Sequence, residues 1–341
     1  MHIPDNYLSP STCATLFVAM TPIWYYSIRK INKTLSADKI PLIGIGGAFA
    51  FILMMFNLPI PDGTTAHAVG GTLIALLLEP YAACIAISVA LFIQAIIFGD
   101  GGILSFGANC FNIAFILPFT GFFIYKILNK IHLSPFYHKC TIFLSAYISI
   151  NLAAFFTALE LGIQPLLFVD NLGQPLYCPY PLWISIPAMA LSHLTIAGIA
   201  EGAFTLSLYL FILKTSPNII YDSQQIKLNS IFSLLAFLII ISPLGLIAEG
   251  TAWGEWTPEE IINDTSSGVP LGFIPEKLLN GFNYEAFFPD YTMNGTTDIL
   301  AYIASAIIGV ALLIIILKYL EVLFMPKTIT LIILLKFLNG F

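Results

Sequence analysis

The chain has 341 residues, of which 58% are hydrophobic and 9% are charged, and its formal net charge is −6. Because soluble domains carry roughly a quarter charged residues, this composition excludes a water-soluble surface and predicts an integral membrane protein. The acidic balance and the lack of a basic patch argue against a nucleic-acid partner. The five cysteines are scattered without a CxxC pair, so we interpret them as apolar side chains within helices rather than as a disulfide framework or a thiolate metal site.

The apolar segments predict the fold. A helix needs roughly 20 apolar residues to cross a bilayer, and a short third segment can be tilted or incomplete. The predicted fold class is an all-α integral membrane protein, a helical bundle of about seven transmembrane helices plus two C-terminal helices. The expected spans are 11–28, 40–58, 67–79, 81–98, 103–125, 141–162 and 182–213, followed by 230–248 and 299–317.

The distribution of basic residues predicts the orientation. The loop after the first span carries the densest basic cluster, from Arg29 to Lys39, and basic loops remain in the cytoplasm. This places the N-terminus outside. Of the 13 Lys and Arg residues, Lys277 alone then falls in an external loop, provided that the C-terminal tail is cytoplasmic.

Three regions are expected. Residues 1–215 form the main bundle, and residues 216–318 form an extension of two spans that enclose an external acidic loop, 249–298. The last region, 319–341, is an apolar tail interrupted by proline and lysine, which is either an interfacial helix or a poorly ordered end.

The first ten residues, MHIPDNYLSP, carry the most distinctive chemistry. They lack the basic start, apolar run and cleavage site of a signal peptide. A bulky second residue predicts that Met1 is retained, which sets its amine beside the backbone amide and the imidazole of His2. These three nitrogens can chelate one ion and suit a square-planar metal such as Ni²⁺, Cu²⁺ or Co²⁺. One corner of the square stays open.

His67 is the candidate for the fourth donor. On the predicted topology it begins a span on the same outer side as the N-terminus, and an ionisable residue within a membrane segment is a functional candidate by default. The segment from His2 to Pro10 can extend about 26–29 Å, which is enough to fold back into the bundle. Binding requires loss of the amine and amide protons, so affinity is expected to rise with pH.

Other polar residues are candidates for positioning this site. Asp100 lies between glycines, where it either caps a turn or orients a ligand imidazole. Asn109 and Asn112 share one helical face, and either hold the N-terminal stretch near Asp5 or bridge two helices.

His193 and Glu201 are weaker candidates, eight residues apart on the seventh span. These two residues form either a polar cluster or a second metal site. A second metal site would indicate an alternative function, as an intramembrane metal-dependent enzyme or a metal-sensing membrane protein. The sequence contains no HExxH or GxSxG motif and no signalling domain. It also contains no GxxxxGK[ST] motif, so it has no P-loop ATP site.

Three stretches carry a family resemblance: MHIPDNYLSP at the start, GTTAHAVGGTL at 63–73 and IQAIIFGDGGILSFGANCFNIAF at 93–115. Together they resemble the CbiM/NikM family, the substrate-binding (S) components of energy-coupling-factor transporters for cobalt and nickel. The resemblance covers about residues 1–215. It departs at Asn6, where the family usually has glycine, although Asn tolerates left-handed backbone better than most residues.

The resemblance implies a function. Met1, His2 and His67 are expected to bind Co²⁺ or Ni²⁺ as transported substrate, in the cell membrane of a prokaryote. The implied partners are a transmembrane coupling (T) subunit and cytoplasmic ATPase subunits. Residues 216–318 more weakly resemble the small accessory N subunit of these systems, and are expected to supply its function in cis.

Overall fold

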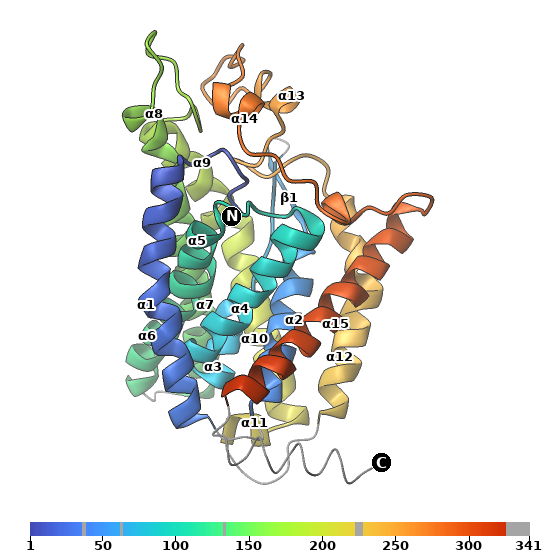
Figure 1. Cartoon of the computed structure of the whole chain (residues 1–341). Helices are drawn as coiled ribbons and strands as arrows, with labels where there is room; N and C mark the ends of the chain where they lie inside the picture. The colour runs from blue at the N-terminus through green and yellow to red at the C-terminus, as the bar shows by residue number, and fades with distance from the viewer. Residues whose placement is uncertain (36–38, 62–63, 132–133, 222–227, 325–341) are drawn as a thin grey trace.

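The structure is a computed structural model that describes residues 1–35, 39–61, 64–131, 134–221 and 228–324. These residues form a bundle of roughly parallel and antiparallel helices, with irregular segments gathered at one end (Figure 1). Within the described residues, six helical stretches are long and apolar enough to cross a membrane. They are Pro80–Phe98, Phe106–Ile131, Pro135–Leu167, Leu182–Thr215, Asn229–Ile247 and Asp298–Leu320.

The N-terminal half alternates long helices with short connections. Its elements are α1 (Pro10–Thr34), α2 (Pro41–Met54), β1 (Leu58–Ile60), β2 (Thr64–Ala66), α3 (Gly71–Leu78), α4 (Pro80–Ile93), η2 (Gln94–Phe98), α5 (Phe106–Asn109), η3 (Cys110–Ile116), α6 (Leu117–Leu128) and η4 (Asn129–Ile131).

The C-terminal half ends in two helices that enclose a long irregular segment. Its elements are α7 (Pro135–Gly162), α8 (Gln164–Leu167), α9 (Leu182–Ser192), η5 (His193–Ala197), α10 (Gly198–Thr215), α11 (Asn218–Tyr221), α12 (Asn229–Ile241), η6 (Ser242–Ile247), α13 (Pro258–Ile261), α14 (Glu276–Asn280), η7 (Pro289–Tyr291) and α15 (Asp298–Phe324).

Helix starts follow from local sequence. Pro10 and Pro135 begin α1 and α7, where a missing N–H costs nothing. The serine before each proline caps the helix: Ser9 accepts a hydrogen bond from the Thr12 amide, and Ser134 accepts one from the Tyr137 amide. The cap at Ser9 fixes the point at which the N-terminal stretch leaves α1.

The centre of the bundle is formed by α2 and α4, whose residues are almost all buried. The α1, α3 and α15 helices pack against α4, which runs through the middle of the view in Figure 1. Helices that are apolar on all sides are typical of such a core position. The final helix, α15, packs along α2, so the C-terminal extension is joined to the main bundle.

Several long helices contain a π-helical segment near one end. The η2 segment continues α4, η3 lies between α5 and α6, and η5 lies between α9 and α10. Such segments interrupt the regular hydrogen-bond ladder and frequently mark functional positions. Here η2 and η3 flank the turn of residues 99–105, which contacts the N-terminal stretch.

The observed helices agree with the predicted all-α membrane fold. The predicted 182–213 span is formed by α9, η5 and α10 in succession. The short 67–79 span is a shorter helix, α3, preceded by irregular backbone that includes His67. The α1 helix has 25 residues but is not among the six stretches that are both long and apolar enough to cross a membrane. Beyond Phe324, the predicted tail lies outside the described residues.

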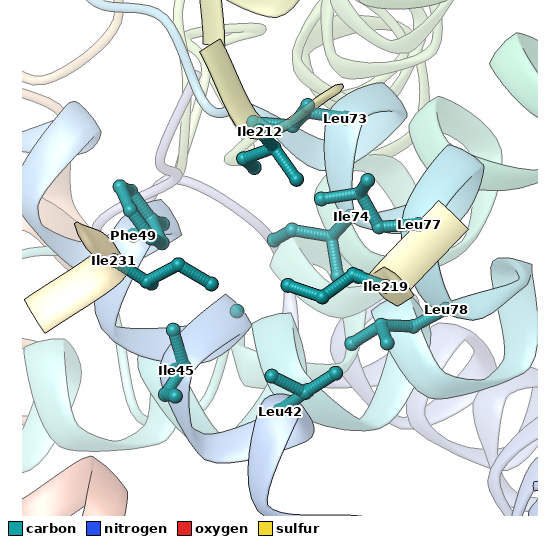
Figure 2. Close-up of a pocket in the computed structure, with 11 residues that line it drawn as sticks. Leu42, Ile45, Phe49, Leu73, Ile74, Leu77, Leu78, Ile212, Ile219 and Ile231 are labelled. Carbon is teal, nitrogen blue, oxygen red and sulfur yellow. The ribbon is translucent and has the colours of Figure 1, made fainter. Parts of the chain in front are cut away.

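A small pocket of about 30 Å³ lies between α2, α3, α10, α11 and α12. Its side chains are all aliphatic or aromatic, and include Phe49, Ile74 and Ile231 (Figure 2). A divalent cation needs nitrogen, oxygen or sulfur ligands, and none of these side chains provides one. This pocket is therefore excluded as a cation site.

Candidate metal centre

The N-terminal stretch is folded into the end of the bundle that carries the irregular segments. Figure 1 shows the N-terminus directed inward beside the helices rather than away from them. Met1 and His2 are buried, and Ile3 and Tyr7 have almost no exposed surface. Burial of the chain terminus means that its charged or polar groups must be satisfied by neighbouring groups.

Asn109 holds the start of this stretch. Its Oδ1 accepts a hydrogen bond from the Ile3 amide at 2.7 Å, and its Nδ2 donates to the Ile3 carbonyl at 3.0 Å. The same carbonyl accepts the Gly102 amide at 2.9 Å. A Cβ at position 102 would lie 2.5 Å from the Asp5 amide nitrogen, so glycine is required for this close approach.

Asp5 fixes the next part of the stretch. Its carboxylate accepts hydrogen bonds from the amides of Ile103 at 3.0 Å and Leu104 at 2.7 Å. Burial raises the pKa of the Asp5 carboxyl, although these backbone hydrogen bonds act in the opposite direction. Asn6 then adopts a left-handed conformation with φ 70°. Asn6 therefore fills the role of the family's usual glycine at this turn.

The backbone segments before and after His67 fix the position of its imidazole. The antiparallel pair β1 and β2, in which Leu58 lies opposite Ala66, ends directly before it. After it, the buried Glu201 carboxylate on α10 accepts hydrogen bonds from the amides of Val69 at 2.7 Å and Gly70 at 2.9 Å. Gly70 has φ 73°, a left-handed conformation that favours glycine. Glu201 thus holds the loop that carries the imidazole.

The three predicted ligand residues meet in one buried place. The imidazole rings of His2 and His67 lie with their centroids 5.0 Å apart, and the two residues are 3% and 6% exposed. The Nε2 atoms of both rings are buried without a hydrogen-bond partner. Buried polar atoms are normally paired, so two unpaired imidazole nitrogens indicate a place for a ligand.

Burial also controls the protonation of His67. Loss of solvent lowers the pKa of its imidazole well below 6.5, and the nearby Met1 amine and His2 lower it further. The imidazole is therefore neutral, which is the form that binds metals. Among the described residues, no group of three or more His, Cys, Asp or Glu side chains could hold an ion.

Asp100 orients His2 rather than serving only as a turn residue. Its Oδ1 lies 2.6 Å from His2 Nδ1, and its Oδ2 accepts hydrogen bonds from Gln94 at 3.0 Å and from the Tyr291 hydroxyl at 2.5 Å. Burial alone raises the pKa of the Asp100 carboxyl, but His2, together with the Tyr291 hydroxyl and His67, outweighs burial and holds the pKa below its usual value. The carboxylate is therefore ionised and fixed.

The Asp100 contact has a consequence for chelation. A ring that joins the His2 amide nitrogen to its imidazole closes through Nδ1, because Nε2 lies too far from the backbone. In this structure Nδ1 faces Asp100 and Nε2 is unpaired. Chelation by all three N-terminal nitrogens therefore requires the imidazole to turn, so that Nδ1 faces the ion and Nε2–H can donate to a carboxylate.

The remaining predicted residues have other partners. Asn112 donates to Glu160 Oε2 at 2.7 Å, so it bridges η3 and α7 instead of contacting the N-terminal stretch. His193 Nδ1 lies 2.9 Å from the Met189 carbonyl, whereas Glu201 holds the 69–70 amides. The structure therefore gives His193 and Glu201 separate roles, and does not unite them in the second metal site that was considered from sequence.

A model of the CbiM family, described as the cobalt uptake substrate-specific transmembrane region, matches residues 2–219. The chain belongs to the CbiM family. A second model, the PDGLE domain, matches residues 228–325. This CbiM-family chain therefore carries two units in a single polypeptide.

The relatives of this CbiM-family chain are transport proteins. It is 44% identical over 324 residues to the "Probable fused nickel transport protein LarMN" of Lactiplantibacillus plantarum, covering 94% of this chain and 98% of the relative. It is 43% identical to the fused nickel transport protein NikMN of Rhodobacter capsulatus, covering 92% and 95%. A crystal structure of a truncated transition metal transporter matches with TM-score 0.60 and 50% identity, covering 63% of this chain and 99% of the other. The chain is thus a multi-pass membrane transport protein and not an enzyme.

Two residues near this site in the CbiM-family chain, Glu255 and Tyr291, were not predicted, and a third, Glu201, was predicted only as a weaker candidate. Glu255 lies 3.3 Å from the Met1 amine, Tyr291 contacts Asp100, and Glu201 holds the loop after His67. Glu255 and Tyr291 lie in the segment between α12 and α15, more than 150 residues from their partners, so spacing in the sequence gives no signal for them. Glu201 was a candidate because a carboxylate on a membrane helix is unusual, but its partners, the Val69 and Gly70 amides, were not predicted.

Proposed function

We propose that this chain is the substrate-capture subunit of an ATP-driven energy-coupling-factor transporter that imports Co²⁺ or Ni²⁺. The ion is held by the Met1 amine, the His2 amide and imidazole, and the His67 imidazole. The observation that carries this proposal is the meeting of Met1, His2 and His67 in one buried place, with the two imidazole rings 5.0 Å apart and His67 Nε2 without a hydrogen-bond partner.

The donor chemistry supports these ions. Four nitrogen donors favour tetragonal or square-planar divalent metals, whereas Mg²⁺ and Ca²⁺ favour oxygen ligands. His67 is already neutral, so it can bind without losing a proton. The Met1 amine and the His2 amide release protons when the ion binds. Asp100 and Asn109 hold the N-terminal stretch so that these groups stay close to His67.

Energy for uptake comes from partner subunits. The sequence contains no P-loop motif, so we assign ATP hydrolysis to cytoplasmic ATPase subunits and transmission of the energy to a membrane-embedded coupling subunit. The C-terminal unit takes the place of a separate accessory subunit. The fused nickel transport relatives and the contacts of Glu255 and Tyr291 at the site support this assignment.

The metal site opens toward the outside of the cell in this proposal. Three helices carry basic residues near their C-terminal ends: Arg29 and Lys30 on α1, Lys126 on α6 and Lys214 on α10. The N-terminal stretch lies at the opposite end of α1. Basic residues favour the cytoplasmic side of a membrane. The external side then carries the N-terminal stretch and the acidic segment. Cations reach the site from that side.

Metal titration of the purified full-length chain tests the site. We would titrate Co²⁺ and Ni²⁺ separately into the wild type, into His67→Ala and into a variant with one extra alanine before Met1. The extra residue moves the free amine away from His2 and breaks the run of three nitrogens. Mass spectrometry of the N-terminal peptide confirms that each protein begins as intended.

The proposal predicts one high-affinity ion per wild-type chain and loss of this binding in both variants. His193→Ala is the matched control, because His193 is also a buried histidine but contacts the Met189 carbonyl, and it should bind as the wild type does. Wild-type affinity in both His67→Ala and the extended chain would place the site elsewhere.

A further inference from the structure

The carboxylate of Glu255 reaches from solvent to the N-terminal amine. Its Oε1 lies 3.3 Å from the Met1 nitrogen, and its side chain is 21% exposed whereas that of Met1 is 1% exposed. Among the described residues, the Met1 amine is the hydrogen-bonding partner of this carboxylate. Glu255 is therefore in contact with a proposed ligand and with the medium outside.

The backbone around Glu255 is held in place. Its amide donates to the Ala252 carbonyl at 3.0 Å, and the next carbonyl, that of Trp256, accepts the Tyr7 hydroxyl at 2.7 Å. The indole rings of Trp253 and Trp256 pack edge to face with centroids 5.3 Å apart. These contacts fix the carboxylate above the N-terminal stretch.

The neighbouring carboxylates are already engaged. Asp100 contacts His2 and the Tyr291 hydroxyl. Glu260 accepts hydrogen bonds from the Thr251 hydroxyl and the Thr257 amide in a capping box. Since the proposed ligands are all nitrogens, Glu255 is the carboxylate placed to offset the positive charge of an arriving divalent ion.

We propose that Glu255 is the loading ligand of the site: its carboxylate binds the incoming divalent cation and passes it to the Met1 amine. This rests on the proposed function. Two ligands of one ion with bonds of about 2.1 Å at a right angle lie about 3 Å apart, close to the observed 3.3 Å. One ion can therefore contact the carboxylate and the amine together.

Glu255 leaves the ion once the four nitrogens have closed around it. A nitrogen site binds Co²⁺ and Ni²⁺ more strongly than a single carboxylate oxygen does, so the carboxylate contributes to the rate of capture rather than to retention. Because a group that is absent from the final complex lowers the barrier in both directions, loss of the carboxylate should slow association and dissociation together and leave the equilibrium affinity nearly unchanged. A residue that merely held the N-terminus in place would instead weaken the affinity through faster dissociation.

Rapid mixing of CoCl₂ with the purified full-length protein tests the role of Glu255. The absorption of bound Co²⁺ measures the association rate. Addition of a chelator to the loaded protein measures the dissociation rate. Glu255→Gln removes the carboxylate and is expected to slow association about tenfold or more, within the range of electrostatic effects on capture. The matched control is Glu259→Gln, which removes an equal charge four residues away at an exposed position. Its association rate should stay within about twofold of wild type.

Glu255→Asp keeps a carboxylate and should bind Co²⁺ faster than Glu255→Gln does. This comparison distinguishes loss of the carboxylate from a general loss of structure at position 255. Wild-type association in Glu255→Gln, equal slowing in Glu259→Gln, or faster dissociation with unchanged association would each overturn the inference. These results are distinct from failure of the proposed function, in which the wild type itself would bind no Co²⁺.

Discussion

The state of single residues at the site follows from burial. His67 is neutral because burial, the Met1 amine and His2 lower the pKa of its imidazole. Below pH 6.5 the unfolded chain therefore binds more protons at this position than the folded chain does. The contribution of His67 to stability is complete above pH 6.5 and declines as the pH falls toward the lowered pKa.

This protonation state predicts how metal binding depends on pH. The affinity for Co²⁺ should increase from pH 6 to pH 8, because the Met1 amine and the His2 amide lose protons on binding while His67 does not. Calorimetry in buffers of different ionisation enthalpy measures the protons released per ion. An affinity that is constant over this range would contradict binding by the amine and the amide.

Asp100 should increase the affinity for the metal ion by holding the His2 imidazole in place. Asp100→Asn removes the charge that fixes the imidazole, and such a change outside the direct ligands typically weakens metal binding about 10–100-fold. Equilibrium titration with Ni²⁺ measures the effect, with Asp298→Asn as an exposed control on the same side of the bundle. If Asp100→Asn binds as tightly as the control, Asp100 acts only in the turn.

At the scale of elements, the site depends on close packing between α1 and α5. A Cβ on Gly107 would lie 2.5 Å from both the backbone nitrogen and the Cα of Phe17. Backbone atoms cannot yield as a side chain can, so α1 would have to move. The α1 helix continues from the N-terminal stretch, and Asn109, which holds Ile3, is two residues from Gly107.

Gly107→Ala should therefore destabilise the protein by about 1–3 kcal/mol and weaken metal binding as well. Thermal unfolding in detergent and Co²⁺ titration measure the two effects. Gly173→Ala is a matched control for added volume, because no atom lies within 4 Å of its Cβ position, although its φ of 82° adds local strain. Unchanged stability in Gly107→Ala would show that the helices separate without cost.

A second contact links α15 to the site through aromatic rings. A Cβ on Gly309 would lie 2.1 Å from Phe51 Cζ, and the Phe51 ring packs against Phe98 and Tyr291. Gly309→Val should displace the Phe51 ring and destabilise the protein by about 1–3 kcal/mol. Thermal unfolding measures this, and Ile307→Val, at an exposed position of the same helix, should have little effect. Equal unfolding temperatures for the two variants would contradict this packing.

Much of this arrangement is predictable from sequence because membrane helices have strong local signals. Long apolar runs indicated the helices, and the N-terminal chemistry together with the family resemblance predicted Met1, His2 and His67 as ligands, three residues that the structure brings together. The partners of Asn112 and Glu201 were not predictable, since they depend on which helix faces which. The Nδ1 contact of His2 with Asp100 also depends on the rotation of a single ring, and no pattern in the sequence encodes that.

At the scale of the whole molecule, the two units meet over the N-terminal stretch. Asn6 donates to the Phe282 carbonyl at 2.8 Å and accepts the Phe282 amide at 2.9 Å, while Glu255 and Tyr291 reach Met1 and Asp100. The segment between α12 and α15 thus covers the proposed metal site, and these two helices fasten it to the bundle beside α2 (Figure 1).

Removal of the C-terminal unit should therefore impair uptake. A chain that ends before residue 229 is expected to lose most Ni²⁺ uptake in cells that lack a separate accessory subunit, because the contacts at Met1, Asn6 and Asp100 are lost. Uptake of radioactive Ni²⁺ measures the effect, with equal membrane abundance as the control. Full uptake by the shortened chain would show that the C-terminal unit is dispensable.

The identity of the metal ligands is the central claim. X-ray absorption spectroscopy of the full-length protein loaded with one Ni²⁺ tests it most directly, because it reports the type, number and arrangement of the ligands. We predict four nitrogen ligands in a square plane, with the imidazole signature of two histidines. A six-coordinate spectrum dominated by oxygen, or one with a sulfur ligand, would contradict binding by Met1, His2 and His67.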